Sequence, residues 1–327
     1  MKASLLAKTG MILVFYSGTI EIDKKGMGKI EAYRDIDWGY ERIVSIGESG
    51  GAKIKIEKIF GVFPELEGVL IIKSKKEPEI TGSIKGKLMK GIFPDIFNEP
   101  LIERTFYLIK DIIASPYQAD TELFGVAKSF PLEKRKIYIN DAIIIEHDSI
   151  KGNRNIITNT ADIYIVSSRV ENLIFISQGN IFITDSHIKN CVLYGEKITI
   201  DENSVCEAGI YGKNVKIRGL LFPHSFVLVY GNNAKLVLKG EARKSTFIGY
   251  ASVDLGIEKL PVIEISPEGA LEGIIAIKGI ADIKGKVKGK VVCYLLQENK
   301  MEGMIEEVPL EKYVSPIYLK GKRKEVE

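Results

Sequence analysis

The segment VLYGEKITIDENSVCEAGIYGK, residues 192–213, contains the dipeptide Tyr-Gly twice, at Tyr194-Gly195 and at Tyr211-Gly212. The two copies lie 17 residues apart, and the residues before them match in phase, as Ile181 and Ile198 do. A third copy, residues 214–232, keeps this phase at Val215 and then gains two residues before its own Tyr-Gly. A fixed step that places like residues in like positions predicts that similar structural units stack on one another.

The stacked units are predicted to be coils of a parallel β-helix. From residue 161 onward, short runs of alternating apolar residues are separated by Gly, Asn and Asp, a pattern that is typical of strands joined by corners. The fixed step favours a solenoid over a β-sandwich. Ile181, Ile198 and Val215 should form one buried column with about 4.8 Å between rungs. Each Tyr-Gly should mark a corner, where glycine tolerates the turn and tyrosine stacks on the rung below.

The full fold prediction is a mainly β protein, in which a parallel β-helix with coils of about 17 residues follows an N-terminal helix and a mixed α+β segment. Residues 1–50 are predicted to hold a strand or degenerate anchor and an amphipathic helix, residues 51–153 the mixed segment, residues 154–296 the β-helix and residues 297–327 a tail. The opening apolar run is shorter than the roughly 20 residues of a membrane-spanning helix. The amphipathic helix is expected over Gly28–Gly47, a second helix over Leu101–Ala114, and a loop over Ala251–Pro261.

The stretch YRDIDWGY, residues 33–40, resembles the motif that follows the membrane helix in minor pilins and pilus-assembly proteins of the type IV pilus group. Tyr33, Ile36, Asp37, Gly39 and Tyr40 occupy the motif positions, with Ile, Asp and Tyr where that family has Ala, Glu and Leu. The resemblance implies protein partners in a pilus or cell-envelope assembly. It also implies that Tyr33, Ile36, Asp37 and Tyr40 lie on a helix that contacts those partners, and it favours a cell-envelope or surface location.

A second resemblance is carried by GALEGIIAIKGIADIKGKVKGKVVC, residues 269–293, in which Gly-x-Ile and Gly-x-Val steps mark the coils. This pattern is similar to that of bactofilins, which are cytoskeletal β-helices that form polymers. The alternative that it implies is a cytoplasmic scaffold that associates with itself end to end.

Carboxylates on neighbouring coils are the candidates for chemistry. In the 17-residue register Asp185 stacks on Glu202, and two carboxylates on adjacent rungs could act as a glycosidase pair or share a calcium ion. Acidic residues at a solvated corner are the alternative explanation, and we expect that one. A polysaccharide-acting β-helix enzyme is therefore the third and most distant function.

The remaining residues give little support for catalysis or for ligand binding. The three histidines, His147, His187 and His224, lie in separate segments, and Cys191, Cys206 and Cys293 lack metal-ligand spacing, so buried thiols are expected. GESGG, residues 47–51, has the spacing of a nucleophile elbow around Ser49, but the strand-like residues that follow predict a glycine-rich turn instead.

The composition narrows the class of partner. The chain has 46 basic and 43 acidic residues, which are spread along its length, so a nucleic-acid partner is not expected. The richness in Lys, Glu and Ile, with only three glutamines, is typical of proteins from hot environments. The sequence predicts a non-catalytic structural protein with protein partners, and no cofactor, metal or small-molecule ligand.

Overall fold

The computed structural model describes residues 2–17, 19–24, 28–37, 39–115, 118–251, 259–309 and 313–326. The chain divides into two compact units. Unit 1 comprises residues 1–64 together with residues 316–327, and unit 2 comprises residues 65–315.

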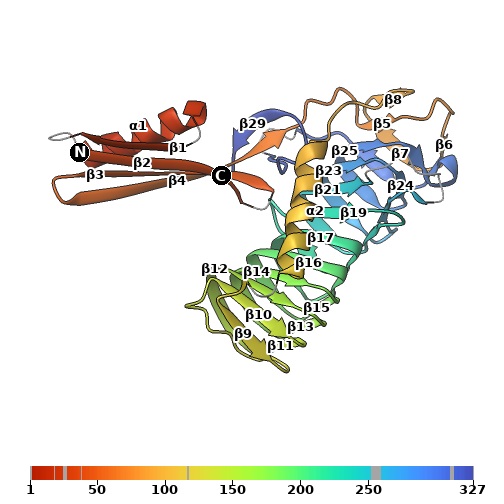
Figure 1. Cartoon of the computed structure of the whole chain (residues 1–327). Coiled ribbons are helices and arrows are strands. Elements are labelled where there is room, and N and C mark those ends of the chain that lie inside the picture. The colour runs from red at the N-terminus through yellow and green to blue at the C-terminus, as the bar shows by residue number, and fades with distance from the viewer. Residues whose placement is uncertain are drawn as a thin grey trace. The chain divides into compact units, whose positions relative to one another are not determined.

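Unit 1 is a five-stranded antiparallel sheet with one helix packed on it (Figure 1). The sheet order is β1 (Thr19–Lys24), β2 (Gly28–Asp37), β3 (Tyr40–Ser49), β4 (Ala52–Phe63) and β29 (Lys322–Glu325). The amphipathic helix predicted over residues 28–47 is therefore wrong, because β2 and β3 form a hairpin there. Its apolar residues alternate across the sheet, and Ile30 and Ala32 are both buried.

The helix of unit 1 is α1 (Lys2–Ser17), so of the two alternatives for the opening residues, a strand or a degenerate anchor, the strand is wrong. Ala3 and Ala7 of α1 are buried against Gly47 of β3, where an added Cβ would lie 2.2 Å from the carbonyl oxygen of Ala3. The small residue at position 47 thus allows the helix backbone to approach the sheet. No helix within the described residues combines the length and the apolar character that crossing a membrane requires.

Unit 2 is a parallel β-solenoid, and the predicted columns are confirmed. Ile181 pairs with Ile198, and Ile198 pairs with Val215, at the predicted step of 17 residues. All three side chains are buried in the solenoid interior. The step lengthens further along, since Val215 pairs with Leu236.

The pairings give the solenoid three sides. Short strands form the first side, and the chain then turns through a corner onto the second side. A further corner leads to the third side, which we call the tyrosine side because it carries Tyr194, Tyr211, Tyr230 and Tyr250. The longer strands bend around corners from one side to the next. The strands of the ascending stack are β9 (Thr121–Phe124), β10 (Lys136–Asn140), β11 (Ile143–Glu146), β12 (Ser149–Asn159), β13 (Ile163–Val166), β14 (Arg169–Ser177), β15 (Ile181–Thr184), β16 (His187–Ile200), β17 (Val205–Ile217), β18 (Leu220–Leu221), β19 (Phe226–Tyr230), β20 (Lys235–Leu238), β21 (Glu241–Tyr250), β22 (Val262–Ile265), β23 (Ala270–Ile277), β24 (Ile280–Ile283), β25 (Lys286–Cys293), β26 (Leu295–Leu296), β27 (Lys300–Met301) and β28 (Met304–Glu306).

The earlier part of unit 2 joins the far end of this stack. β5 (Leu70–Ile72) pairs with β25, and β7 (Ser83–Lys85) pairs with β28, both in parallel. β6 (Glu79–Ile80) pairs with β27, and β8 (Leu88–Lys90) pairs with β5. Parallel pairing thus extends beyond residues 154–296 in both directions. The chain begins unit 2 at one end of the solenoid, and β9 lies at the other end (Figure 1).

The helix α2 (Glu99–Ala114) connects these two ends, and it confirms the helix predicted over residues 101–114. Figure 1 shows it running along the solenoid across successive rungs. The loop predicted over residues 251–261 lies largely outside the described residues, which resume at Lys259.

Candidate functional site

The tyrosine side of the solenoid is covered by α2. The ring of Phe106 stacks on Tyr230 with ring centres 4.0 Å apart, and it meets Tyr194 and Tyr211 edge-on at 6.4 and 6.3 Å. Tyr194-Gly195 and Tyr211-Gly212 lie in register on β16 and β17. The repeated tyrosines therefore build an aromatic surface on which the helix packs, in addition to marking a corner.

Outward-facing positions on the tyrosine side are apolar for the same reason. Ile174 and Ile176 of β14 and Leu228 of β19 lie outside the interior cluster but are buried. The C-terminal residues of unit 2 also lie against this side, because the hydroxyl of Tyr313 hydrogen-bonds Thr246, which in turn donates to Ser315 at 3.2 Å. The tyrosine side is thus covered by other parts of the same chain, namely α2 and the C-terminal residues of unit 2.

A polar cluster fixes the first turn of α2. The Tyr250 hydroxyl donates to the Glu99 carboxylate at 3.0 Å, and Lys278 donates to the same carboxylate. The hydrogen bond from Lys278 lowers the pKa of Glu99, whereas burial followed by the hydrogen bond to Glu99 raises the pKa of Tyr250. An ion pair in this place stabilises the start of the helix, where negative charge is also favoured by the helix dipole.

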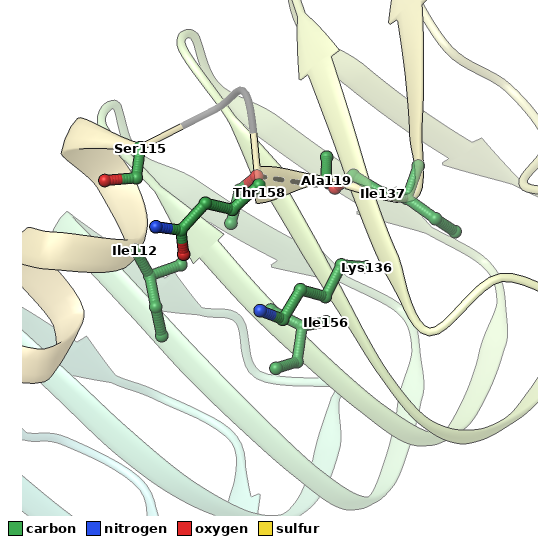
Figure 2. A pocket seen from close by; sticks show the side chains of 8 residues that line it. Ile112, Ser115, Ala119, Lys136, Ile137, Ile156 and Thr158 are labelled. Atoms are coloured by element: carbon green, nitrogen blue, oxygen red, sulfur yellow. Dashed lines mark hydrogen bonds between the residues drawn. The ribbon is translucent and has the colours of Figure 1, made fainter.

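A pocket lies beyond the last turn of α2, with an empty volume of about 340 Å³ that includes open solvent (Figure 2). Its walls are mixed in character, since Ile112 faces Ile156 while Lys136 contributes an amine. The hydroxyl of Thr158 is used within the wall, because it donates to the carbonyl of Ile137 at 3.3 Å. The pocket lies where the solenoid continues past its helix, and its lining is Ile112, Ser115, Gln118, Ala119, Lys136, Ile137, Ile156 and Thr158.

Beyond this pocket lies the β9 end of the solenoid, which is made of residues 121–130. Within the described parts of the chain, β9 pairs only with β10. Phe124 is 77% exposed and Val126 is 50% exposed. The partly buried side chains of Leu123 and Phe130 close the interior. This end therefore combines a strand edge with exposed apolar side chains, which is the composition of a protein-binding surface.

The opposite end, which we call the lysine end, is made of β6, β7 and β8. Lys85, Lys87 and Lys90 lie along these last strands, where they form ion pairs with Glu306, Glu67 and Glu77. Lysine side chains along an edge strand oppose the approach of another strand. The two ends of the solenoid thus differ in their chemistry.

The residues predicted for an assembly helix lie instead on the hairpin of unit 1. Tyr33 pairs with Val44, and Asp37 pairs with Tyr40 across the strands. Ile36 pairs with Glu41, and the side chains of Ile36 and Asp37 lie outside the described structure. The helical face predicted for these four residues is therefore wrong.

The two candidate carboxylates, Asp185 and Glu202, lie at a corner and contact different residues. The Asp185 carboxylate accepts a hydrogen bond from Ser167 at 3.2 Å, and the backbone N–H of Asp185 donates to Asp201 at 3.1 Å. Glu202 instead borders an open hollow with Arg218, Lys239 and Glu268, of which Lys239 and Glu268 form an ion pair at 3.0 Å. The two acidic and two basic side chains give this corner no net charge.

The cysteines and Ser49 are placed as predicted. All three cysteines are buried free thiols, and burial raises the pKa of Cys191 to about 11. Cys191 pairs with Ala208, as the 17-residue register requires. Ser49 ends β3, and Gly50 and Gly51 form a turn with φ of +58° and +78°. Across the described residues, no group of three or more His, Cys, Asp and Glu side chains could hold a metal ion.

Comparison with known proteins gives no relative. No family model matches the chain, and neither a curated protein nor a solved structure matches it.

Proposed function

We propose that this protein is a non-catalytic structural component, a rigid solenoid that assembles with protein through its β9 end. The observation that supports this proposal most is that one apolar surface of the solenoid is covered while another is exposed. The tyrosine side is occupied by α2, whereas the β9 end keeps Phe124 and Val126 exposed.

The interior of the solenoid supports a structural role. It is filled along its length by aliphatic side chains, and its corners use their polar groups in hydrogen bonds between rungs. Such a stack resists deformation, because each rung is joined to its neighbours by backbone hydrogen bonds.

The two finer proposals differ in location. Pilus or cell-envelope assembly would place the protein at the surface, and the motif that carries this resemblance lies on β2 and β3. A scaffold of the bactofilin kind would be cytoplasmic and would associate with itself end to end; the accessible strand edge of β9 favours self-association, whereas the charged opposite end does not favour growth into a polymer. Fractionation of cells that produce the protein distinguishes the two locations.

The experiment that tests the proposed function is the native size of the full-length protein in extracts of cells that produce it. We expect a complex larger than one chain that is lost in Phe124→Asp. The matched control is Tyr107→Asp, which changes a side chain of α2 that is 69% exposed. A single-chain size for the wild type, or a complex that survives Phe124→Asp, would overturn the proposal.

A further inference from the structure

We propose that the partner at the β9 end is a second copy of this chain, related by a two-fold axis, and that assembly stops at the dimer. This inference rests on the proposed function, since it names the occupant of the same surface.

The edge of β9 requires a partner that offers backbone hydrogen bonds. Of the strands described, β10 alone pairs with β9, so the other edge of β9 presents N–H and C=O groups. When a partner covers the apolar side chains of Phe124 and Val126, it also displaces water from these backbone groups. Another strand can then replace the lost hydrogen bonds. A second β9 offers the same groups in the same short length.

The lysine end does not offer an equivalent edge. Lys85 and Lys90 belong to the last strands there, and Lys87 lies between them. β9 carries one charged residue, Glu122. Pairing of β9 with the lysine end would bury ion-paired ammonium and carboxylate groups against Phe124, and the loss of their solvation is unfavourable. Pairing of two lysine ends would bury the ion pairs of Lys85, Lys87 and Lys90 on both copies, which costs their solvation. The contact between two β9 ends is the one that the edge chemistry favours, and a contact of this isologous kind closes after two chains.

The alternation of side chains and the charge of Glu122 together select the register of this contact. Leu123 faces the interior beside Ile139, whereas Glu122 and Phe124 face outward. In an antiparallel pair with both interiors on one side, inward residues must oppose inward residues, and the register that places Leu123 opposite Leu123 of the second copy pairs the large inward side chains and keeps the two Glu122 side chains from opposing each other. Phe124 of each copy then lies opposite Glu122 of the other, against the aliphatic stem of that side chain.

This register makes Phe124→Asp a specific test. The substitution would place two carboxylates opposite each other at each of two symmetric positions. Because Phe124 is 77% exposed, we expect the variant to keep the thermal midpoint of a folded solenoid. Adding Glu122→Lys to Phe124→Asp would restore opposite charges across the interface.

The measurement is the mass of the purified full-length protein by sedimentation across a range of concentrations. We expect a dimer for the wild type and for the control Tyr107→Asp, at least a tenfold weaker dimer for Phe124→Asp, and recovery of the dimer in the double variant.

Three results would overturn the inference: a monomeric wild type, a wild type that grows beyond the dimer, or a double variant that stays as weak as Phe124→Asp. A monomeric wild type whose larger complex in extracts still requires Phe124 would remove the second copy but leave the proposed function standing.

Discussion

One corner of the solenoid turns through residues in the left-handed backbone region. His147, Ser167 and Asp185 occupy equivalent positions on successive rungs, with φ between +46° and +53°. Asp and Asn tolerate this conformation because their short polar side chains bond locally, whereas a β-carbon without such a bond is strained there. The backbone conformation of this corner therefore explains why an aspartate occupies position 185, and no catalytic role is needed to account for it.

Asp185→Ala is predicted to lower the free energy of unfolding by about 1 kcal/mol, while Asp185→Asn stays close to the wild type. Glu202→Ala should have almost no effect, because Glu202 is exposed at the corner. Urea unfolding checks the stabilities, and incubation with polysaccharides checks for cleavage. A polysaccharide lyase or glycosidase activity that is lost in both Asp185→Ala and Glu202→Ala would contradict the structural assignment.

Ile198→Asp is predicted to cost at least about 3 kcal/mol in the free energy of unfolding, because a charge would lie in the interior column between Ile181 and Val215. The matched control is Thr199→Asp, one residue along and facing outward, for which we expect a loss below about 1 kcal/mol. Equal losses for the two variants, measured by denaturant unfolding, would show that the column is not the interior.

Cys191 predicts a dependence of stability on pH. Burial raises the pKa of its thiol from the ordinary 9.0 to about 11, so the unfolded chain loses this proton at a lower pH than the folded chain. The stabilising contribution is complete below pH 9 and is lost as the pH rises from 9 to about 11, on the order of 1–3 kcal/mol. Cys191→Ala should flatten this decline, and an unchanged slope in that variant would contradict the assignment to Cys191.

At the scale of elements, α2 depends on Phe106. Phe106→Ala is predicted to lower the free energy of unfolding by about 3 kcal/mol, because the ring is buried among Tyr194, Tyr211 and Tyr230. Tyr107→Ala removes a neighbouring ring that is 69% exposed and should change little. Thermal unfolding with near-ultraviolet circular dichroism compares the two, and a Phe106→Ala variant as stable as Tyr107→Ala would contradict the packing of the helix.

The elements also show what the sequence can predict. Coils of the solenoid could be predicted because each rung repeats an alternation of large aliphatic residues, and α2 because its apolar residues repeat at helical spacing. The sequence does not predict the hairpin of β2 and β3, since several of its inward positions hold small or polar residues, such as Ala32, Ser45 and Gly47. These residues are small because α1 packs closely there, which is a tertiary constraint.

At the scale of the whole molecule, the path of the chain brings distant segments together. α2 has 16 residues and is about 24 Å long, which matches about five rungs of the solenoid. It thereby carries the chain from the lysine end toward the β9 end. A local repeat predicts neighbouring rungs, but it does not predict that residues 70–90 join the last ones. The β9 end as an exposed surface could not be predicted for the same reason, because a sequence does not show which coil is left without a neighbour.

Hydrogen exchange of the full-length protein, measured at β9 over a range of protein concentrations, tests assembly through this end most directly. We predict that protection of residues 121–124 rises with concentration, because their edge becomes paired, while the interior strand β17 stays protected throughout. The same protection should be weak at every concentration in Phe124→Asp. Protection at β9 that does not change with concentration in the wild type would contradict the account.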